Sequence, residues 1–398
     1  MNHTKKRNKN YARPSKRRSS GGKRNMTSIN PDQLMRMAQK PVKEIETPEH
    51  QPAWQYEATS LSPAIKANLA RLGYTTPTPI QEQTVFPAID KRDVLGIAGT
   101  GTGKTAAFLI PIISQLLVDH KNTRALVVVP TRELALQVDR EFQQLSKGMQ
   151  LKASCFIGGT KVNVDLNRLR KLNHIIIGTP GRLLDLAYRK ALKLNDFSTL
   201  VLDEFDRMLD MGFLPDVQKI LAAMSSRQQT MFFSATIEKS QRELIGEILT
   251  NPVEAYVSQG YSASDQVQQE VIRLENGSKK FDVMLDMIRE DHFKKVLIFA
   301  ETKRVVNQLD KQLYKSGIRC DVIHGNKTQN YRVKALKKFT DGKVQVLVAT
   351  DVAARGLDVS DVSHVINYQL PRTMDSYIHR IGRTGRAGKQ GTAITFVD

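Results

Sequence analysis

Residues 93–105 combine a short apolar run, Asp93-Val-Leu-Gly-Ile97, with a glycine-rich loop, Ala98-Gly-Thr-Gly-Thr-Gly103-Lys104-Thr105. The run predicts a buried strand, and the helical spacing of residues 106–117 predicts a helix after the loop. Glycines let successive backbone N–H groups face inward and bind phosphate oxygens at a helix N-terminus. Lys104 would reach the β- and γ-phosphates, and the Thr105 hydroxyl would ligate Mg²⁺. A turn that binds nothing is the alternative, which Gly-Lys-Thr in this context disfavours. The strict pattern has glycine where Ala98 stands.

Outward from this loop, short β-branched runs alternate with segments of helical spacing. The runs are 93–97, 125–129, 175–177, 200–202 and 231–233, and later 296–299, 320–323, 344–348, 365–368 and 393–397. Near-continuous apolar strands alternating with helices predict parallel α/β sheets covered on both faces. The alternation pauses between Asn251 and residue 264, which predicts a linker. We therefore expect two α/β domains, residues 51–256 and 267–398, joined by a linker at 257–266.

Composition restricts the class of protein. The chain has 398 residues, 40% of them hydrophobic and 25% charged, which excludes a wholly disordered, collagenous or membrane-spanning chain. The longest apolar run, residues 106–118, is too short to span a bilayer, so we expect no membrane partner. The two cysteines, Cys155 and Cys320, lie far apart, which disfavours a disulfide framework and a cysteine-built zinc site. A reducing, intracellular setting is favoured.

The positive charge is concentrated at the N-terminus. The formal net charge is +20, and residues 1–40 contain 12 Lys or Arg against a single acid, Asp32. Almost nothing apolar occurs in the first 25 residues, so they cannot bury enough surface to fold. We expect residues 1–50 to form a disordered basic extension that adds affinity for nucleic-acid phosphates. A solvated tail or a nuclear localisation address is the alternative.

A second motif, which is acidic, follows the strand that ends at Leu202. It reads Asp203-Glu204-Phe205-Asp206. Because ligands of open parallel sheets bind at the carboxyl ends of strands, Asp203 would hold Mg²⁺ and Glu204 would orient and deprotonate an attacking water. Two acids at the start of a loop are usually a helix N-cap; the phosphate-binding loop upstream favours the catalytic interpretation.

Taken together, the motifs resemble those of the DEAD-box ATP-dependent RNA helicases of superfamily 2, over about residues 53–398. The first-domain motifs are Gly73–Gln81, Pro130–Ala135, Gly158-Gly159, Thr179–Arg182 and Ser234-Ala235-Thr236, beside the loop and acidic motif above. The second-domain motifs are Val296–Phe299, His324-Gly325, Gln329–Arg332, Ala349–Asp358 and His379–Arg386. About ten motifs in register are very hard to obtain by chance. The resemblance implies two tandem RecA-like domains.

The resemblance assigns a role to each nucleotide-site residue. Gln81 would recognise the adenine edge and Tyr74 would stack against it, while Tyr56 stands where the family usually has an isolated Phe. The residues implied to hold ATP are Tyr56, Tyr74, Thr78, Gln81, Ala98, Gly99, Thr100, Gly101, Thr102, Gly103, Lys104, Thr105 and Asp358. The implied catalytic residues are Lys104, Glu204 and two arginine fingers, Arg383 and Arg386. ATP and Mg²⁺ are the implied cofactors.

RNA is the implied partner, held by its phosphates and sugars with little base reading. The implied contacts are Arg132, Gly159, Thr179, Gly181, Arg182, Arg332 and Thr350. Asp206, Ser234, Thr236 and His379 would couple the nucleotide state to strand separation. The expected activity is RNA-stimulated ATP hydrolysis with local, non-processive separation of short duplexes. His324 and His379 have no metal-spaced partners, so we expect neither to bind a metal.

Two departures from the family pattern bear on this interpretation. Phe205 replaces the usual alanine, which puts the contacts of Asp206 with Ser234 and Thr236 in doubt. The chain also ends at Asp398, directly after its last predicted strand, where the family adds a helix, so a truncated product is one expectation. An RNA-annealing chaperone with weak ATPase activity is the main alternative, and a DNA helicase is disfavoured by the motif wording. We expect a cytoplasmic protein, or a nuclear one in a eukaryote.

Overall fold

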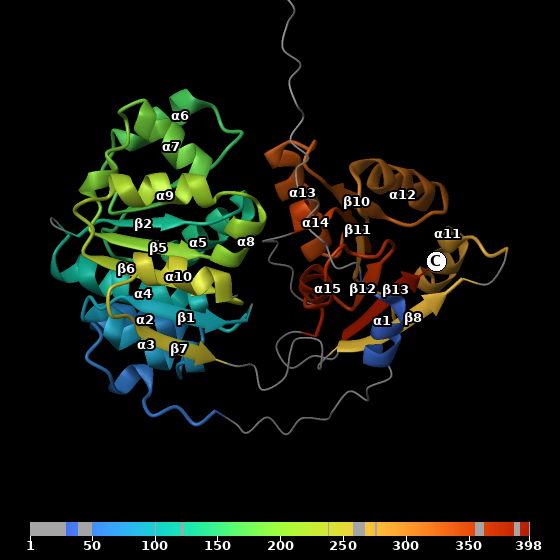
Figure 1. Ribbon diagram of the computed structural model, residues 1–398, viewed down its shortest axis with the longest axis horizontal. Coiled ribbons are helices and arrows are strands. Elements are labelled where there is room, and N and C mark those ends of the chain that lie inside the picture. The colour runs from blue at the N-terminus through green and yellow to red at the C-terminus, as the bar shows by residue number, and fades with distance from the viewer. Residues whose placement is uncertain are drawn as a thin grey trace, which may run out of the picture.

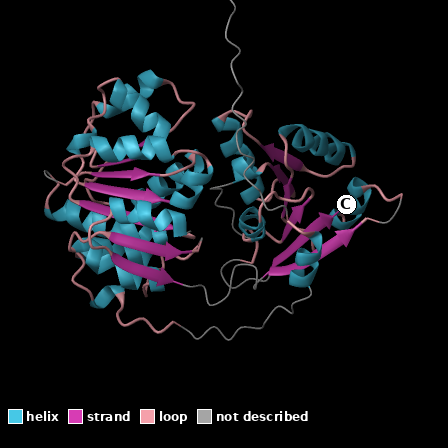
Figure 2. Ribbon diagram, viewed as in Figure 1, coloured by secondary structure: helices cyan, strands magenta, loops and turns pink. Residues whose placement is uncertain are grey.

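The computed structural model contains two parallel β-sheets, each covered by helices on both faces (Figures 1 and 2). It describes residues 29–38, 50–99, 101–120, 123–237, 239–257, 267–274, 277–354, 362–385 and 391–397. The predicted pair of α/β domains is thereby confirmed. No helix within these described ranges is long and apolar enough to cross a bilayer.

The first sheet has seven strands in the order β3-β4-β2-β5-β6-β1-β7, all parallel. Their bounds are β1 Val94–Ala98, β2 Ala125–Val128, β3 Ala153–Phe156, β4 Ile175–Gly178, β5 Thr199–Asp203, β6 Gln229–Ser234 and β7 Val253–Val257. Most of their side chains are apolar and buried, as a sheet covered on both faces requires. In Figure 2 the arrowheads of these strands point toward the second domain, so the carboxyl edge of the sheet faces that domain.

Helices cover the two faces of this sheet in separate groups. One face packs against α2 (Pro63–Arg71), α3 (Pro79–Ile89), α4 (Lys104–Val118) and α5 (Arg132–Leu145). The other packs against α7 (Pro180–Tyr188), α8 (Phe205–Asp210), α9 (Leu214–Ala223) and α10 (Lys239–Ile248). The short helix α6 (Val162–Leu169) follows β3, and single 3₁₀ turns lie at Tyr56–Ala58 and Leu194–Asp196. Helices that directly follow a strand have their first turn at the carboxyl edge of the sheet.

The second sheet has six parallel strands in the order β10-β11-β9-β12-β13-β8. Their bounds are β8 Val267–Arg273, β9 Val296–Phe299, β10 Cys320–Ile323, β11 Val346–Ala349, β12 His364–Asn367 and β13 Gly391–Val397. α11 (Lys280–Ile288) and α12 (Lys303–Lys315) cover one face. α13 (Gln329–Thr340), α14 (Asp351–Ala354) and α15 (Met374–Ile381) cover the other.

One helix departs from the sequence expectation. Residues 31–38 lie within the segment expected to be disordered, yet they form α1 (Pro31–Ala38). α1 packs against β8 of the second domain rather than against the first domain that follows it in the chain (Figure 1). The expectation of disorder therefore does not hold for residues 31–38. The most basic part of the extension, residues 1–28, lies outside the described residues.

Candidate active site

The glycine-rich loop connects β1 to α4, as the sequence predicts. Gly101 and Gly103 have φ values of 83° and 90°, a left-handed conformation that favours glycine. Gly103 caps α4, and Thr102 Oγ1 donates a hydrogen bond to the Gly99 carbonyl at 2.8 Å. Thr100 lies outside the described residues. The loop thus leads into the N-terminus of α4 at the carboxyl edge of the first sheet, and helix N-termini bind anions.

Lys104 lies buried beneath this loop. Its Nζ donates to the carbonyl oxygens of Ala98 and Gly99, the latter at 2.9 Å. Burial lowers the pKa of Lys104, and the carboxylates of Asp203, Glu204 and Asp206 oppose that effect. The ammonium is therefore close enough to all three acids to interact with them, and it folds back onto its own loop.

The residues predicted to recognise adenine are bonded to the loop. Gln81 Nε2 donates to the Gly103 carbonyl at 3.1 Å, while its Oε1 accepts from the Thr78 N–H and the Tyr56 hydroxyl, each at 2.9 Å. Gln81 thereby caps the first turn of α3 by accepting the N–H of its N-cap residue, Thr78. Tyr56 is buried, and burial raises the pKa of its phenol. Tyr74 is half-buried against the same core.

Trp54, the single tryptophan of the chain, was not predicted from the sequence. Its ring packs edge-on against Tyr56 and Phe86, with centroid distances of 5.2 and 5.0 Å. It thereby supports the segment that carries Tyr56. Its position two residues before Tyr56 was the available signal.

The acidic motif occupies the end of β5 and the start of α8. Asp203 is 2% exposed, and burial, followed by the neighbouring Glu204 carboxylate, raises its pKa well above the ordinary range. Its Oδ1 accepts the Glu204 N–H at 2.9 Å. Glu204 has φ 53° and ψ 49°, a left-handed conformation that is uncommon for a residue other than glycine. Such strained positions cluster at functional sites.

Arg207 fixes the side chain of Glu204. The Arg207 Nη1 and Glu204 Oε2 atoms are 2.8 Å apart, and the arginine side chain is 2% exposed. Arg207 Nη2 is buried and has no hydrogen-bond partner. An unpaired buried donor is costly. Sequence reasoning missed this residue, although its position directly after the acidic motif was a signal.

Asp206 contacts both predicted coupling residues of its domain. Its backbone N–H donates to Ser234 Oγ at 3.3 Å, and its Oδ2 accepts from Thr236 Oγ1 at 3.2 Å. Ser234 Oγ in turn donates to the Thr236 carbonyl at 2.8 Å. These contacts form even with Phe205 in place of alanine. The Phe205 ring is 1% exposed and packs against Phe232, 4.7 Å between centroids, so it points into the core and not toward Asp206.

The second domain supplies arginines near the end of α15. Arg383 is 5% exposed, and its Nε donates to the His379 carbonyl at 3.3 Å. Arg380 is fixed by Asp351, with Nη2–Oδ2 at 2.7 Å, and by the Asn367 side chain at 3.2 Å. Arg380 is thus committed to its own domain. The predicted residues Asp358 and Arg386 lie outside the described residues.

Arg132 and the paired glycines form one predicted RNA surface of the first domain. Arg132 begins α5, and its guanidinium lies directly over Gly158 and Gly159. Gly159 has φ 82°, and a Cβ there would collide with the guanidinium. Thr179 caps α7, with Gly181 in its first turn. Backbone N–H groups at helix starts and an arginine are groups that can contact phosphates.

Arg182 differs from the other predicted RNA residues. Its side chain is 7% exposed, and its Nε lies 3.2 Å from the fully buried Asp165. The same Nε donates to the Ile157 carbonyl at 3.1 Å, while Nη1 donates to Asp185 at 3.3 Å and Nη2 donates to Thr160. The structure therefore places Arg182 as an internal support of the Gly158–Thr160 loop, with its guanidinium turned away from solvent.

Arg332 connects the two domains. Its Nη2 lies 2.9 Å from Glu133 Oε1 in the first turn of α5, and both side chains are nearly buried. The same nitrogen donates to the Ala353 carbonyl at 3.1 Å. Burial lowers the pKa of Arg332, and Glu133 opposes that effect. Because Glu133 follows Arg132 in the chain, this ion pair joins the predicted RNA residues of both domains. Thr350, at the carboxyl end of β11, precedes α14 on the same side of the second sheet.

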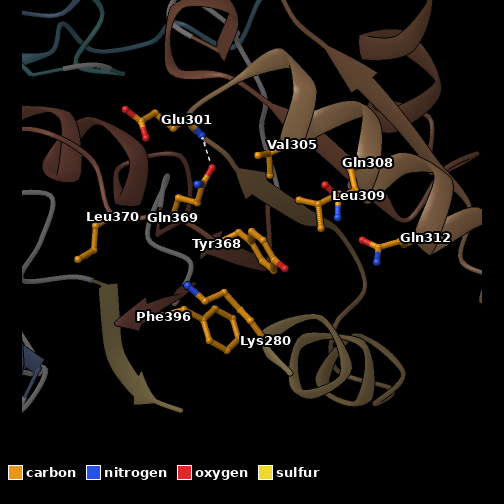
Figure 3. A pocket seen from close by; sticks show the side chains of 10 residues that line it. All are labelled: Lys280, Glu301, Val305, Gln308, Leu309, Gln312, Tyr368, Gln369, Leu370 and Phe396. Atoms are coloured by element: carbon orange, nitrogen blue, oxygen red, sulfur yellow. Dashed lines mark hydrogen bonds between the residues drawn. The ribbon is translucent and has the colours of Figure 1, made fainter. Parts of the chain in front are cut away.

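Two pockets lie away from the nucleotide loop. One, of about 820 Å³, lies between the domains: α5, β3 and the Gly159–Lys161 loop form one wall and α13 contributes Asn330 and Val333, with Thr328 just before it. The other, of about 480 Å³, belongs to the second domain, where Lys280 lies over the Tyr368 ring and Gln369 accepts the Glu301 N–H (Figure 3). Gly159 is the predicted RNA residue at the first pocket. The second is lined by none of the predicted residues.

A lysine held under the glycine-rich loop after β1, with carboxylates at the end of β5 on the other side of β6, is the arrangement of P-loop nucleoside triphosphatases. The second α/β domain, which reaches the first through Arg332, makes this chain a two-domain member of that class. Residues 78–244 match the DEAD/DEAH box helicase family, and residues 279–388 match the helicase conserved C-terminal domain. The chain belongs to the DEAD-box family of ATP-dependent RNA helicases, which are RNA-stimulated ATPases.

Individual relatives agree with this assignment. The chain is 41% identical over 342 residues to the DEAD-box ATP-dependent RNA helicase CshA of Bacillus subtilis, covering 86% of this chain and 69% of that protein. The CshA of Listeria monocytogenes is 41% identical over 343 residues, with 86% and 66% covered. This chain therefore spans about two thirds of the length of these relatives.

Solved structures show the same two-domain fold. The S. cerevisiae protein Dbp5, bound to RNA and ADP BeF3, matches with a TM-score of 0.74 and 29% identity, over 85% of this chain and 88% of that one. Mss116p bound to single-stranded RNA and AMP-PNP matches with a TM-score of 0.78 and 30% identity, over 87% and 76%.

Proposed function

We propose that this chain hydrolyses ATP as its two domains close around RNA, and that closure separates short duplexes without processive movement. The observation that carries the proposal is the division of labour between the domains. The nucleotide loop and the acids belong to the first domain, whereas Arg332 and Arg383 belong to the second. Turnover that needs both sets must await closure, and RNA that bridges both domains favours the closed state.

Within the first domain, Glu204 acts as the general base for the attacking water, and Arg207 orients its carboxylate. We propose Asp203-Glu204-Phe205-Asp206 as this chain's form of the acidic motif that names the family. Lys104 leaves the carbonyl groups of its own loop and binds the β- and γ-phosphates. Gln81 and Tyr74 hold the adenine, with Tyr56 and Thr78 behind Gln81.

Magnesium fits this site. Asp203 and Glu204 are adjacent carboxylates at a buried strand end, and their mutual repulsion helps to raise the pKa of Asp203. A divalent cation relieves such repulsion. Asp203 and Thr105 would hold Mg²⁺, which supplies charge neutralisation for the phosphates. Magnesium usually keeps several waters and is bound by one or two carboxylates together with substrate phosphates.

From the second domain, Arg383 and Arg386 serve as arginine fingers and Asp358 contacts the ribose, while His379 joins Asp206, Ser234 and Thr236 in coupling. RNA lies across Arg132, Gly159, Thr179, Gly181 and Thr350, beside the pocket of about 820 Å³ between the domains. Arg332 binds RNA after it leaves Glu133. The basic residues 1–28 add non-specific affinity for nucleic acid. We propose a cytoplasmic location.

Steady-state ATP hydrolysis tests this function directly. We expect single-stranded RNA to stimulate hydrolysis strongly and DNA of equal length to stimulate it weakly. A short RNA duplex should then be separated in the presence of ATP, and the Glu204→Gln variant should hydrolyse ATP far more slowly. RNA binding without stimulation of hydrolysis would contradict the proposal and would indicate an annealing protein instead.

A further inference from the structure

α1 lies against the second domain, on the face of the sheet that also carries α15. Leu34 is 0% exposed and belongs to a cluster with Val267 of β8, Ala393 of β13 and Tyr377 of α15. Ile29 and Val271 pack around the same cluster. Figure 1 shows α1 beside β8 and β13, separated from the helices of the first domain. A leucine from the N-terminal segment therefore completes the core of the second domain.

One ion pair joins α1 to this surface, and two hydrogen bonds lie within its own first turn. Asp32 Oδ1 lies 3.1 Å from Arg273 Nη2 at the end of β8. The Asn30 side chain accepts the Asp32 N–H at 2.9 Å, and the Asn30 carbonyl accepts the Leu34 N–H at 3.3 Å. The pair of Asp32 and Arg273 is well exposed and contributes little by itself. It sets the orientation, while Leu34 provides the buried contact.

α1 owes its order to this contact. Isolated helices shorter than about 12–15 residues are marginal in water, and α1 has eight. On the sheet, Val267 and Val271 are four residues apart on β8 and so face the same side. With Tyr377 and Ala393 they form a strip of apolar side chains, and Leu34 and Ile29 of the N-terminal segment pack onto it.

Chain connectivity favours docking within one molecule. Residues 39–49 join α1 to the first domain, which begins at residue 50, and such a segment spans at most about 40 Å. A short tether gives an effective concentration of order mM. A contact too weak to hold a free peptide is therefore sufficient to hold α1.

We propose that the strip formed by Val267, Val271, Tyr377 and Ala393 is a docking surface for a short amphipathic helix, and that α1 of the same chain occupies it. Docking makes residues 39–49 a second tether between the domains, joined covalently to the first domain and held to the second by the packing of α1, in addition to the covalent connection through residues 258–266. It also attaches the basic residues 1–28 to the second domain, although they precede the first domain in the chain. The inference concerns α1 alone and is independent of ATP hydrolysis.

Hydrogen–deuterium exchange on the full chain tests the docking. We compare the amides of residues 29–38 in the native chain, in Leu34→Gln and in Arg36→Gln. Both variants gain the same side chain on the same helix, but Leu34 is buried and Arg36 is exposed. We expect protection of about tenfold or more in the native chain and in Arg36→Gln, and its loss in Leu34→Gln. An unprotected native segment, or equal protection in both variants, would overturn the proposal.

A charge exchange identifies the surface. Asp32→Arg and Arg273→Asp should each reduce protection of residues 29–38 moderately, and the double variant should restore it. If the double variant did not restore protection, α1 would not dock beside Arg273. Diluting the native chain a hundredfold should leave the protection unchanged, whereas a loss on dilution would mean that α1 docks on a second copy and would refute docking within one molecule.

Discussion

The nucleotide site and the RNA surface of this chain are built differently. Lys104, Gln81 and Glu204 are each held by partners in the first domain: the loop carbonyls, Tyr56 with Thr78, and Arg207. The proposed RNA surface instead includes a contact between the domains, because Arg332 pairs with Glu133, the residue after Arg132. The nucleotide-site side chains are thus held within their own domain, whereas Arg332 of the second domain is held by Glu133 of the first. We propose that RNA replaces this contact between the domains.

The first prediction tests the nucleotide site, whose side chains are held within the first domain. Replacing Glu204 with Gln removes the proposed base while keeping the size of the side chain, so turnover should fall by about 10²–10⁴. ATP binding should persist, since Lys104 and Gln81 are unchanged. Glu243→Gln, which removes an exposed charge, is the control and should retain full turnover. Normal hydrolysis by Glu204→Gln would exclude the assignment.

The second prediction compares two arginines. Arg182 of α7 was expected to bind RNA but is buried, and Arg189 lies at the end of the same helix. Arg182→Ala would leave Asp165 buried without its partner, so we expect the first domain to lose roughly 3–5 kcal/mol of stability. Arg189→Ala removes a half-exposed pair with Asp185 and should cost about 0.5 kcal/mol or less. Thermal denaturation measures both. Similar melting temperatures for the two variants would show that Arg182 is not an internal support.

The sequence predicted the fold and the nucleotide loop because both depend on local patterns. Apolar runs specify strands, and Gly-Lys-Thr after a strand specifies the phosphate loop. In the sequence, Phe205 put the contacts of Asp206 with Ser234 and Thr236 in doubt. In the structure its ring lies in the core beside Phe232. Arg182 shows the limit: the motif identifies the residue, but only the fold shows that Asp165, from α6, neutralises it. Arg207 and α1 were missed because their roles depend on partners that the sequence pattern does not reveal.

The third prediction tests the contact between domains. Glu133→Gln keeps the shape of the side chain but removes the carboxylate that competes with phosphate for Arg332. We expect RNA to bind about fivefold more tightly at moderate salt, a difference of about 1 kcal/mol. Fluorescence anisotropy with a short single strand measures this, and Glu243→Gln controls for the change in net charge. Weaker binding would mean that Glu133 supports the RNA surface instead of competing with RNA.

A similarly small effect is expected behind the adenine site. Tyr56→Phe removes one hydrogen bond to Gln81 Oε1, which still accepts the Thr78 N–H. The stability should fall by about 0.5–1.5 kcal/mol, and the preference for ATP over GTP should narrow because Gln81 becomes less firmly oriented. Tyr188→Phe, at an exposed position, should change neither quantity. If Tyr56→Phe lowered stability with no change in nucleotide preference, Tyr56 would act only through packing against Trp54, and Gln81 would be held sufficiently by its bonds to Thr78 and Gly103.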